Sequence, residues 1–315
     1  MIWEKLSSKK PYFVLAPMDD VTDSVFRRIV AEAAKPDLFF TEFVSVDGLS
    51  SPGREALWKK LEFVADMETP LIAQVWGLRP ENYFSVAKEL SGMGFAGIDI
   101  NMGCPVPVVT KNGACSALIK NRPLATEIIQ ATIDGAGNTP VSVKTRIGYD
   151  KIDLSWPEML MGMDIAALTI HGRTTKEMSK VPNHWDVIAD IVKMRDKLKP
   201  ELQIIGNGDV SSRKHGVDLA AEFGVDGIMI GRGVFHDPFV FSEQSPWPEM
   251  SPEQKIDMYK KHINLFIEFW GDKKNPAGLK KFAKVYINGF TGASELRTRL
   301  MACNNAEELL IALAS

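Results

Sequence analysis

Eight short apolar segments recur along the chain, and most are followed by a stretch with a helical pattern. Most of these segments are nearly continuous in Val, Ile, Leu and Phe, which is typical of strands buried on both faces of a parallel sheet. Strand and helix repeated eight times predict an α/β fold, a (β/α)8 TIM barrel. The expected strands are residues 12–17, 38–44, 70–76, 97–103, 140–146, 166–172, 202–209 and 227–233, and the expected helices are 23–33, 81–92, 124–136, 185–198 and 211–223.

The pattern changes after residue 241. Residues 242–252 contain three prolines and no apolar period, so we interpret them as a linker. Ser251 is placed as an N-cap with Pro252 at the first helical position, and helical patterns cover 252–270, 277–289 and 306–314. A barrel needs about 250 residues. We therefore predict a barrel domain over residues 1–245 and a small all-helical domain over 246–315.

Composition narrows the class of protein. Charged residues at 24% and hydrophobic residues at 45% describe an ordinary globular chain. Three cysteines make a disulfide framework improbable and fit a reducing compartment. Residues 1–10 lack the apolar stretch of a signal peptide, and no apolar run approaches the roughly 20 residues that span a bilayer. We expect a cytoplasmic protein with no membrane partner.

Charge is unevenly distributed along the chain. Residues 251–300 hold ten basic and five acidic side chains, a net charge of +5, and because the whole chain carries −3, the remainder carries −8. Such asymmetry suggests a surface for a polyanion in the tail. An ordinary solvated helical surface decorated with lysines explains the composition equally well.

Polar residues gather where the expected strands end, which is the face where α/β barrels carry their chemistry. Taken singly, Lys144, His171 or the turn at 206–209 each has an ordinary structural explanation. Together they would suit a ligand that is aromatic, polar-edged and phosphorylated, with the Gly-rich ends of the last two strands cradling a phosphate. The strand-end residues are Pro17, Met18, Asp19, Gln74, Asn101, Cys104, Lys144, Arg146, His171, Arg173, Asn207, Gly208, Asp209, Gly231 and Arg232.

Residues 101–105 read Asn-Met-Gly-Cys-Pro and place a thiol where a strand breaks into a loop. A thiol can serve as an acid, because free Cys has a pKa of roughly 8.5 that its surroundings can move. A lone cysteine is more often a buried structural residue, and it is the neighbouring polar groups that favour catalysis by Cys104. We interpret Cys115 as a packing variant. The cysteines and histidines form no paired motif at metal spacing, so we expect no metal site.

These segments resemble the tRNA-dihydrouridine synthases, in the order in which that family carries them, over residues 12–235. The Asn-Met-Gly-Cys-Pro stretch is the most specific. The tail is similar to the family's C-terminal RNA-binding domain, although Val285 stands where many members carry His. The matching stretches are 15–18 (Leu-Ala-Pro-Met), 74–77 (Gln-Val-Trp-Gly), 99–105 (Asp-Ile-Asn-Met-Gly-Cys-Pro), 143–146 (Val-Lys-Thr-Arg), 169–173 (Thr-Ile-His-Gly-Arg), 206–209 (Gly-Asn-Gly-Asp) and 229–232 (Met-Ile-Gly-Arg).

The resemblance implies an FMN enzyme that reduces the C5–C6 double bond of particular uridines in tRNA, with NADPH as reductant. Cys104 would donate the proton to C5 and would be largely protonated at neutral pH. The resemblance places Asn101 and Arg173 near the uracil and Lys280, Lys281 and Lys284 on the RNA. Its implied flavin contacts are Pro17, Met18, Asp19, Gln74, Lys144, His171, Asn207, Gly208, Asp209, Gly231 and Arg232.

Two other functions remain open at this point. One is an FMN barrel acting on a free pyrimidine, as a dihydroorotate dehydrogenase-like enzyme would, and the basic tail counts against it. The other is a flavin-binding RNA chaperone that remodels tRNA without reducing it, and the presence of Cys104 together with Lys144 counts against that. The sequence fixes neither the uridine position nor the oligomeric state, for which we expect a monomer.

Overall fold

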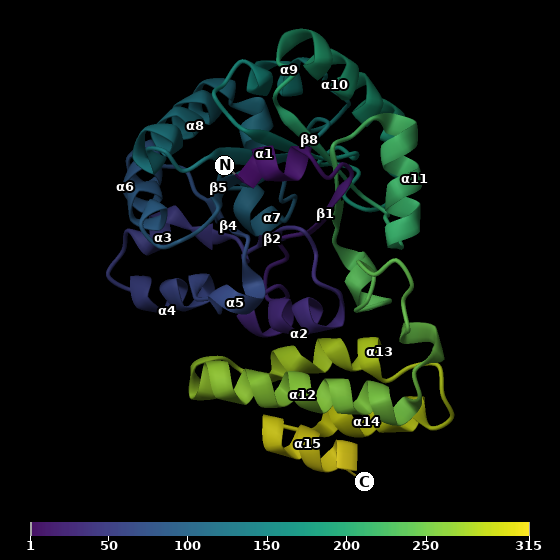
Figure 1. The fold of residues 1–315 in the computed structure, drawn as a ribbon. Coiled ribbons are helices and arrows are strands. Elements are labelled where there is room, and N and C mark those ends of the chain that lie inside the picture. The colour runs from purple at the N-terminus through teal and green to yellow at the C-terminus, as the bar shows by residue number, and fades with distance from the viewer. Residues whose placement is uncertain (1, 315) are drawn as a thin grey trace. The chain divides into compact units, whose positions relative to one another are not determined.

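The nine strands of the computed structural model, which describes residues 2–314, form one parallel sheet (Figure 1). The order is β1-β9-β8-β7-β6-β5-β4-β2, with β3 also paired to β4. A parallel bridge between Val14 and Leu38 joins the two ends, so the sheet is a nearly closed barrel and the predicted TIM-barrel class is confirmed. The strands are β1 (Tyr12–Leu15), β2 (Phe39–Phe40), β3 (Val44–Ser45), β4 (Leu71–Trp76), β5 (Gly97–Met102), β6 (Val141–Arg146), β7 (Ala167–His171), β8 (Gln203–Asn207) and β9 (Gly227–Ile230).

The expected strand at residues 38–44 is broken in two. Its parts, β2 and β3, both pair with β4. Between them the hydroxyl of Thr41 accepts the backbone N–H of Gln74 at 3.0 Å, where a regular ladder would use a carbonyl. A side-chain acceptor therefore interrupts the ladder at a position that the apolar pattern alone does not reveal.

The helices between the strands agree with the sequence where they are long. In α11, the side chain of Ser212 accepts the backbone N–H of His215, and Gly224 ends the helix in the left-handed conformation at φ 74°. The helices of the barrel are α1 (Ile2–Ser7), α3 (Val46–Leu49), α4 (Arg54–Trp58), α5 (Ala65–Glu68), α6 (Pro80–Ser91), α7 (Pro107–Thr110), α8 (Arg122–Ala136), α9 (Ser155–Met161), α10 (Trp185–Leu198) and α11 (Arg213–Phe223), with short 3-10 turns η1 (Lys59–Leu61) and η2 (Cys115–Lys120).

The barrel interior is apolar toward the amino ends of the strands. Ile72, Ala167, Ile205 and Met229 belong to one buried cluster that also contains Trp3 of α1. Trp3 and Leu6 of helix α1 therefore pack against this apolar end of the barrel, and Figure 1 shows the ribbon of α1 lying across the strands. Because side chains alternate along a strand, the next inward position on β4, β7 and β8 lies toward the carboxyl ends, where the site begins.

Packing divides the chain into two compact units, residues 1–24 with 36–231 and residues 25–35 with 232–315. Among the described residues the second unit contains helices and no strand, and its helix α14 is not expected from the sequence. The predicted division at 245/246 stays a prediction. The helices of this unit are α2 (Ser24–Ala34, from residue 25), η3 (Arg232–Phe235), η4 (Trp247–Glu249), α12 (Pro252–Trp270), η5 (Gly271–Lys273), η6 (Pro276–Phe282), α13 (Ala283–Tyr286), α14 (Ala293–Ala302) and α15 (Ala306–Ala314).

Aromatic side chains form the core of the second unit. The rings of Phe26 and Phe282 lie 4.9 Å apart, and those of Tyr259 and Tyr286 stack at 5.0 Å. The imidazole of His262 lies between them, 3.1 Å from the hydroxyl of Tyr286. No helix within residues 2–314 is both long and apolar enough to cross a membrane.

Candidate active site

Four polar side chains form a hydrogen-bonded chain on the inner wall of the barrel, across β4, β5 and β6. The amide of Gln74 donates to one oxygen of Asp99 at 2.7 Å, and the hydroxyl of Ser142 donates to the other at 2.6 Å. The amide of Asn101 in turn donates to the oxygen of Gln74 at 3.1 Å. The parallel register explains this contact, because Asp99 lies beside both Gln74 and Ser142 in the sheet. Burial raises the pKa of Asp99 to about 6, although its two hydrogen bonds and Lys144 oppose the rise.

Lys144 lies beside Asn101 in the register of β5 and β6, and its ammonium donates to the oxygen of Asn207 on β8 at 3.1 Å. Among residues 2–314 no carboxylate forms an ion pair with it. Burial and the nearby charge of Arg146 lower the pKa of Lys144 to about 8. The result is a cation inside the barrel whose remaining donors are available to an anionic or carbonyl group.

The loop after β5 is held from both sides. The side-chain oxygen of Asn101 accepts the backbone N–H groups of Gly103 and Cys104, at 3.0 and 2.9 Å. From β6, the guanidinium of Arg146 donates to the carbonyl of Gly103 at 2.7 Å. Asn101 is buried, so the structure places it as a support for Cys104, and its predicted contact with uracil stays a prediction.

Two thiols meet at this loop. Cys115, which begins η2, is fully buried with Val109 and Ala114, and Cys104 packs against that cluster. Contact with the thiol of Cys115 lowers the pKa of Cys104 to about 7, with smaller contributions from the backbone of Val106 and from Arg146, while burial opposes the shift. The same contact raises the pKa of Cys115 far above its ordinary value. Cys104 therefore titrates nearer to neutral pH than the sequence-based expectation of a largely protonated thiol.

Each nitrogen of the Arg173 guanidinium has a polar partner. Its Nε donates to the carbonyl of Val181 at 2.6 Å, one terminal nitrogen lies 3.2 Å from Nε2 of His171, and the other pairs with Asp209. Arg173 is almost fully buried, and these contacts link the end of β7 to the end of β8. Its predicted contact with uracil is not tested, and the carboxylate of Asp209 is occupied by this pair.

The end of β8 comes close to a residue that sequence reasoning missed, Asn183. A Cβ on Gly208, at φ 130°, would lie 2.1 Å from the side-chain oxygen of Asn183, so only glycine fits there. Gly172 faces the same amide. Within the described part of the chain neither end of that amide has a hydrogen-bond partner, although both atoms are buried. No sequence pattern marked Asn183, because its place depends on the turn before α10.

A glycine, Gly231, also follows the end of β9. A Cβ on Gly231 would lie 3.5 Å from Cβ of Ala16 and 3.7 Å from the sulfur of Met18, which is ordinary contact. Gly231 therefore sits against the end of β1. Arg232 begins η3 and belongs to the second unit, and its predicted phosphate contact stays a prediction.

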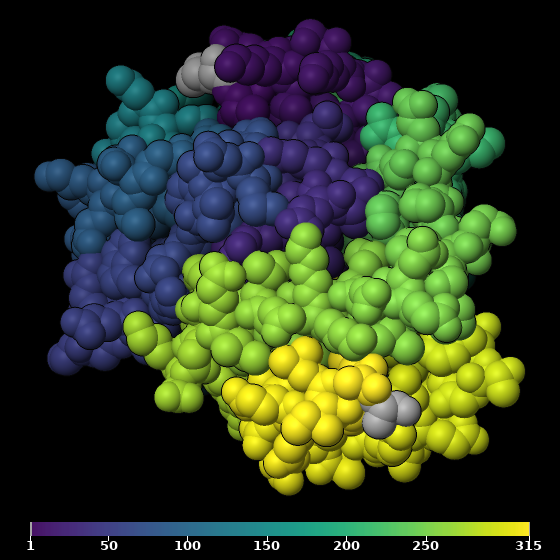
Figure 2. Space-filling model, turned by 60° about the horizontal axis from the view of Figure 1, so that its bottom comes forward, coloured from purple at the N-terminus to yellow at the C-terminus, as the bar shows by residue number. Residues whose placement is uncertain are grey.

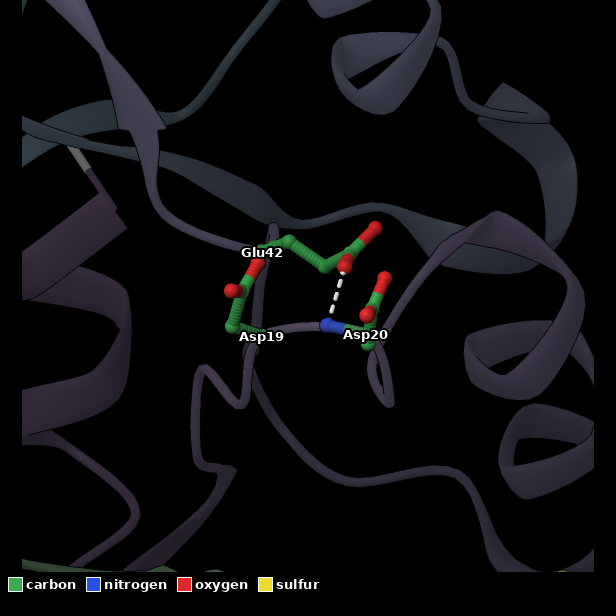
Figure 3. A group of neighbouring side chains, drawn as sticks. All are labelled: Asp19, Asp20 and Glu42. Carbon is green, nitrogen blue, oxygen red and sulfur yellow. Dashed lines mark hydrogen bonds between the residues drawn. The ribbon is translucent and has the colours of Figure 1, made fainter. Parts of the chain in front are cut away.

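The bend after β1, which follows Pro17, carries an acidic group shown in Figure 3. Asp19, Asp20 and Glu42 bring carboxylate oxygens within 4.8 Å of one another, and the backbone N–H of Asp20 donates to Glu42 at 2.5 Å. The ammonium of Lys60 lies 3.0 Å from Asp19 and 3.6 Å from Glu42. These carboxylates raise the pKa of Lys60 although burial opposes the rise, so a lysine already supplies positive charge there.

The backbone of Met18, one of the predicted flavin contacts, is hydrogen-bonded within this bend. The backbone N–H of Met18 donates to the hydroxyl of Thr22 at 2.9 Å, and the carbonyl of Met18 accepts from the same residue. The Asp19 side chain is turned to Lys60. The expected backbone contacts of Pro17, Met18 and Asp19, like the expected absence of a metal, stay predictions.

The basic side chains of the second unit differ in their exposure and in their hydrogen bonds to the protein. Residues from about 250 onward appear in light green and yellow in Figure 2. The ammonium of Lys280 donates to the carbonyl of Met301 at 2.9 Å, and Arg299 donates to that of Ala312 at 2.7 Å. Lys281 and Lys284 are exposed, the first with its ammonium 5.5 Å from the ring of Phe282. Of the three predicted RNA-contacting lysines, these two have the more accessible side chains.

Comparisons with known proteins agree with this arrangement. A family model described as "Dihydrouridine synthase (Dus)" matches residues 14–315. A protein of Staphylococcus aureus (strain COL) named "Probable tRNA-dihydrouridine synthase" is 45% identical over 310 residues, covering 97% of this chain and 92% of the relative. A protein of Bacillus subtilis (strain 168) named "Probable tRNA-dihydrouridine synthase 2" is 44% identical over 311 residues, covering 98% of this chain and 94% of the relative.

Solved structures support the fold. Morphinone reductase superposes with a TM-score of 0.52 at 14% identity, covering 73% of this chain and 84% of that one. The old yellow enzyme homologue from Zymomonas mobilis superposes with a TM-score of 0.51 at 16% identity, covering 72% and 86%. At such low identity these likenesses concern the barrel alone.

Proposed function

The chain belongs to the dihydrouridine synthase family, and we propose that it reduces the C5–C6 double bond of particular uridines in tRNA, with FMN as cofactor and NADPH as reductant. The relatives named tRNA-dihydrouridine synthases support the substrate, since they match almost the whole chain. The resemblance of the strand-end motifs supports the cofactor. The site geometry supports the assignment of roles.

The residues at the barrel mouth fit a flavin. Lys144 is a cation without a carboxylate partner among the described residues, which suits the electron-rich N1–C2=O end of an isoalloxazine. Gly208 lets the side chain of Asn183 approach the end of β8 closely, and among residues 2–314 the buried amide of Asn183 has no hydrogen-bond partner. This combination suits a phosphate end. The residues that would hold FMN are Pro17, Met18, Asp19, Gln74, Lys144, His171, Asn207, Gly208, Asp209, Gly231 and Arg232.

When bound, FMN supplies the hydride that is added to C6 of the uracil ring. The chain's own contribution is the proton for C5, which the thiol of Cys104 carries. The side chain of Asn101 and the guanidinium of Arg146 fix the two peptide groups next to that thiol, so the donor needs little reorganisation when the base arrives. General acids work best when their pKa lies near the working pH, and the pKa of Cys104, about 7, meets that condition.

Access to the base requires the RNA to change shape. A uridine within a stack must be extruded before it can reach the barrel interior, which costs a few kcal/mol. Lysines of the second unit, Lys281 and Lys284 above all, would contact phosphates and offset that cost. We propose that the helical unit is the RNA-binding part and that the enzyme works in the cytoplasm as a monomer.

The observation that carries the proposal is the held thiol of Cys104 at the end of β5, in the same barrel mouth as Lys144. The test uses tRNA from a strain that lacks the gene, incubated with the purified chain, FMN and NADPH. Nucleoside mass spectrometry should show dihydrouridine appearing and uridine falling in equal amount. Reduction of free uracil or orotate, with no change in tRNA, would instead support the free-pyrimidine function.

A further inference from the structure

Cys115 lies in a cluster against which the catalytic thiol packs, although the two cysteines are eleven positions apart in sequence. It is fully buried in an apolar cluster against which Cys104 packs. The two segments are also joined through the backbone, because the N–H of Ser116 donates to the carbonyl of Cys104 at 3.3 Å. The side chain of Cys104 therefore packs against the same apolar cluster that contains the buried thiol of Cys115.

The backbone at Cys115 is unusual for a residue with a side chain. Its φ is 54°, in the left-handed region, where a side chain costs on the order of 1 kcal/mol and glycine costs nothing. Filling apolar space does not by itself explain a cysteine, rather than a glycine, at such a backbone position. An outlier of this kind next to a reactive group points to a use for the side chain.

We propose that Cys115 is a positioning residue for the acid: its thiol donates an S–H hydrogen bond to the sulfur of Cys104, which orients that sulfur and stabilises the thiolate left after proton transfer. This inference rests on the proposed function and deepens it. It also replaces the interpretation of Cys115 as a packing variant, because the sequence alone could not show that Cys104 packs against the cluster that contains Cys115.

Three charged side chains also act on Cys104. Arg146 on β6 favours its thiolate form, and Asp19 in the bend after β1 opposes it. The ammonium of Lys144 and the Cys104 thiolate attract each other. Arg146 and Lys144 remain when Cys115 is replaced, so a change in the titration of Cys104 reports the loss of the S–H donor.

The pH dependence has a definite sign. Cys104 donates a proton only below its pKa, so uridine reduction should fall as pH rises through that value. Without the donor at position 115 the thiolate is less stable, the pKa of Cys104 rises, and the alkaline limb moves to higher pH. The plateau at low pH should fall several-fold, because a weaker acid transfers its proton more slowly.

The direct test measures the thiol itself. Iodoacetamide reacts with thiolates, so the pH midpoint of Cys104 alkylation in the purified full chain, followed by peptide mass spectrometry, reports its titration. Cys115→Ala should raise the midpoint by about one pH unit, which from a midpoint near 7 leaves about fivefold less thiolate at pH 7. Cys115→Ser keeps an O–H donor and should lie nearer to wild type, and Cys303→Ala, which removes a buried thiol of the second unit, should match wild type.

A second variant protects the test from misfolding. Cys115→Gly suits the left-handed backbone and should show the same upward shift as Cys115→Ala. Midpoints equal to wild type in the folded variants would overturn the inference even if the enzyme modifies tRNA. A shifted midpoint in a protein that forms no dihydrouridine would leave the thiol pair intact and overturn the proposed function instead.

Discussion

Lys144 shows how the chemistry depends on the environment of single side chains. Its ammonium is buried enough for its pKa to fall to about 8, and it donates a hydrogen bond to the neutral amide of Asn207. Asp99 and the Cys104 thiolate favour its charged form, but no carboxylate within residues 2–314 forms an ion pair with it, so an anionic ligand in contact would stabilise the charge further. The fit to a reduced flavin therefore follows from this residue more than from the glycines around it.

Replacing Lys144 tests that fit. Lys144→Ala removes a charge-assisted hydrogen bond worth about 1.5–3 kcal/mol, so FMN should dissociate about 10- to 100-fold more readily. The measurement is the flavin fluorescence released during dialysis, together with the rate of flavin reduction by NADPH. Lys214→Ala is the control, since that lysine is exposed and pairs only with Asp218 on its own helix. Unchanged retention and unchanged reduction in Lys144→Ala would argue against a flavin at this position.

Much of the site could be predicted residue by residue, but its internal partners could not. Lys144 and Asn207 were both named from the ends of their strands, and the structure joins them. The support of Cys104 by Asn101 and the contact with Cys115 depend on how two loops fold back, which no spacing in the sequence encodes. Asn183 was missed for the same reason.

At the scale of elements, length decides what the sequence reveals. The strands around 97–102 and 203–207 and the helix at 185–198 fall almost where the apolar pattern puts them. Helices of four or five residues, such as α3 and α7, complete too few turns to leave a period. Helix α14 buries only Ala293 and Leu300, so it has no apolar stripe by which to recognise it.

The start of α12 offers a test at this scale. The side chain of Ser251 accepts the N–H of Gln254, and the side chain of Gln254 accepts the N–H of Ser251, a complete capping box. Ser251→Ala should lower the free energy of unfolding by about 1 kcal/mol, measured by urea denaturation of the full chain. Thr298→Ala is the matched control, because that hydroxyl bonds only to the carbonyl of Ser294 within its own helix. An equal effect of the two substitutions would mean that the cap contributes nothing.

Net charge is unevenly distributed along the sequence of the whole molecule. The stretch 251–300 carries +5 and the remainder −8. Negative charge elsewhere would repel a polyanion, so binding of tRNA would depend on the lysines of the helical unit. The assignment of that unit to RNA therefore predicts a steep dependence of binding on salt.

The exposed pair Lys281 and Lys284 tests this assignment. Each phosphate contact adds about 0.9 to the slope of log affinity against log salt, so the double variant Lys281→Ala with Lys284→Ala should lower the slope by up to about 2. The slope is measured by filter binding of unmodified tRNA over a salt series. Lys193→Ala with Lys214→Ala, on exposed faces of barrel helices, should leave it unchanged. Equal slopes in all three proteins would place the RNA contacts elsewhere.

The central claim is that this barrel reduces uridine in tRNA with Cys104 as the proton donor. The most direct measurement separates the two halves of the reaction in wild type and Cys104→Ala: reduction of bound flavin by NADPH, then reoxidation of the reduced enzyme by tRNA in the absence of oxygen. The account predicts equal rates in the first half. In the second half it predicts a loss of about 10²- to 10⁴-fold in Cys104→Ala, the usual contribution of general acid catalysis. Reoxidation by tRNA at the wild-type rate in Cys104→Ala would contradict the account.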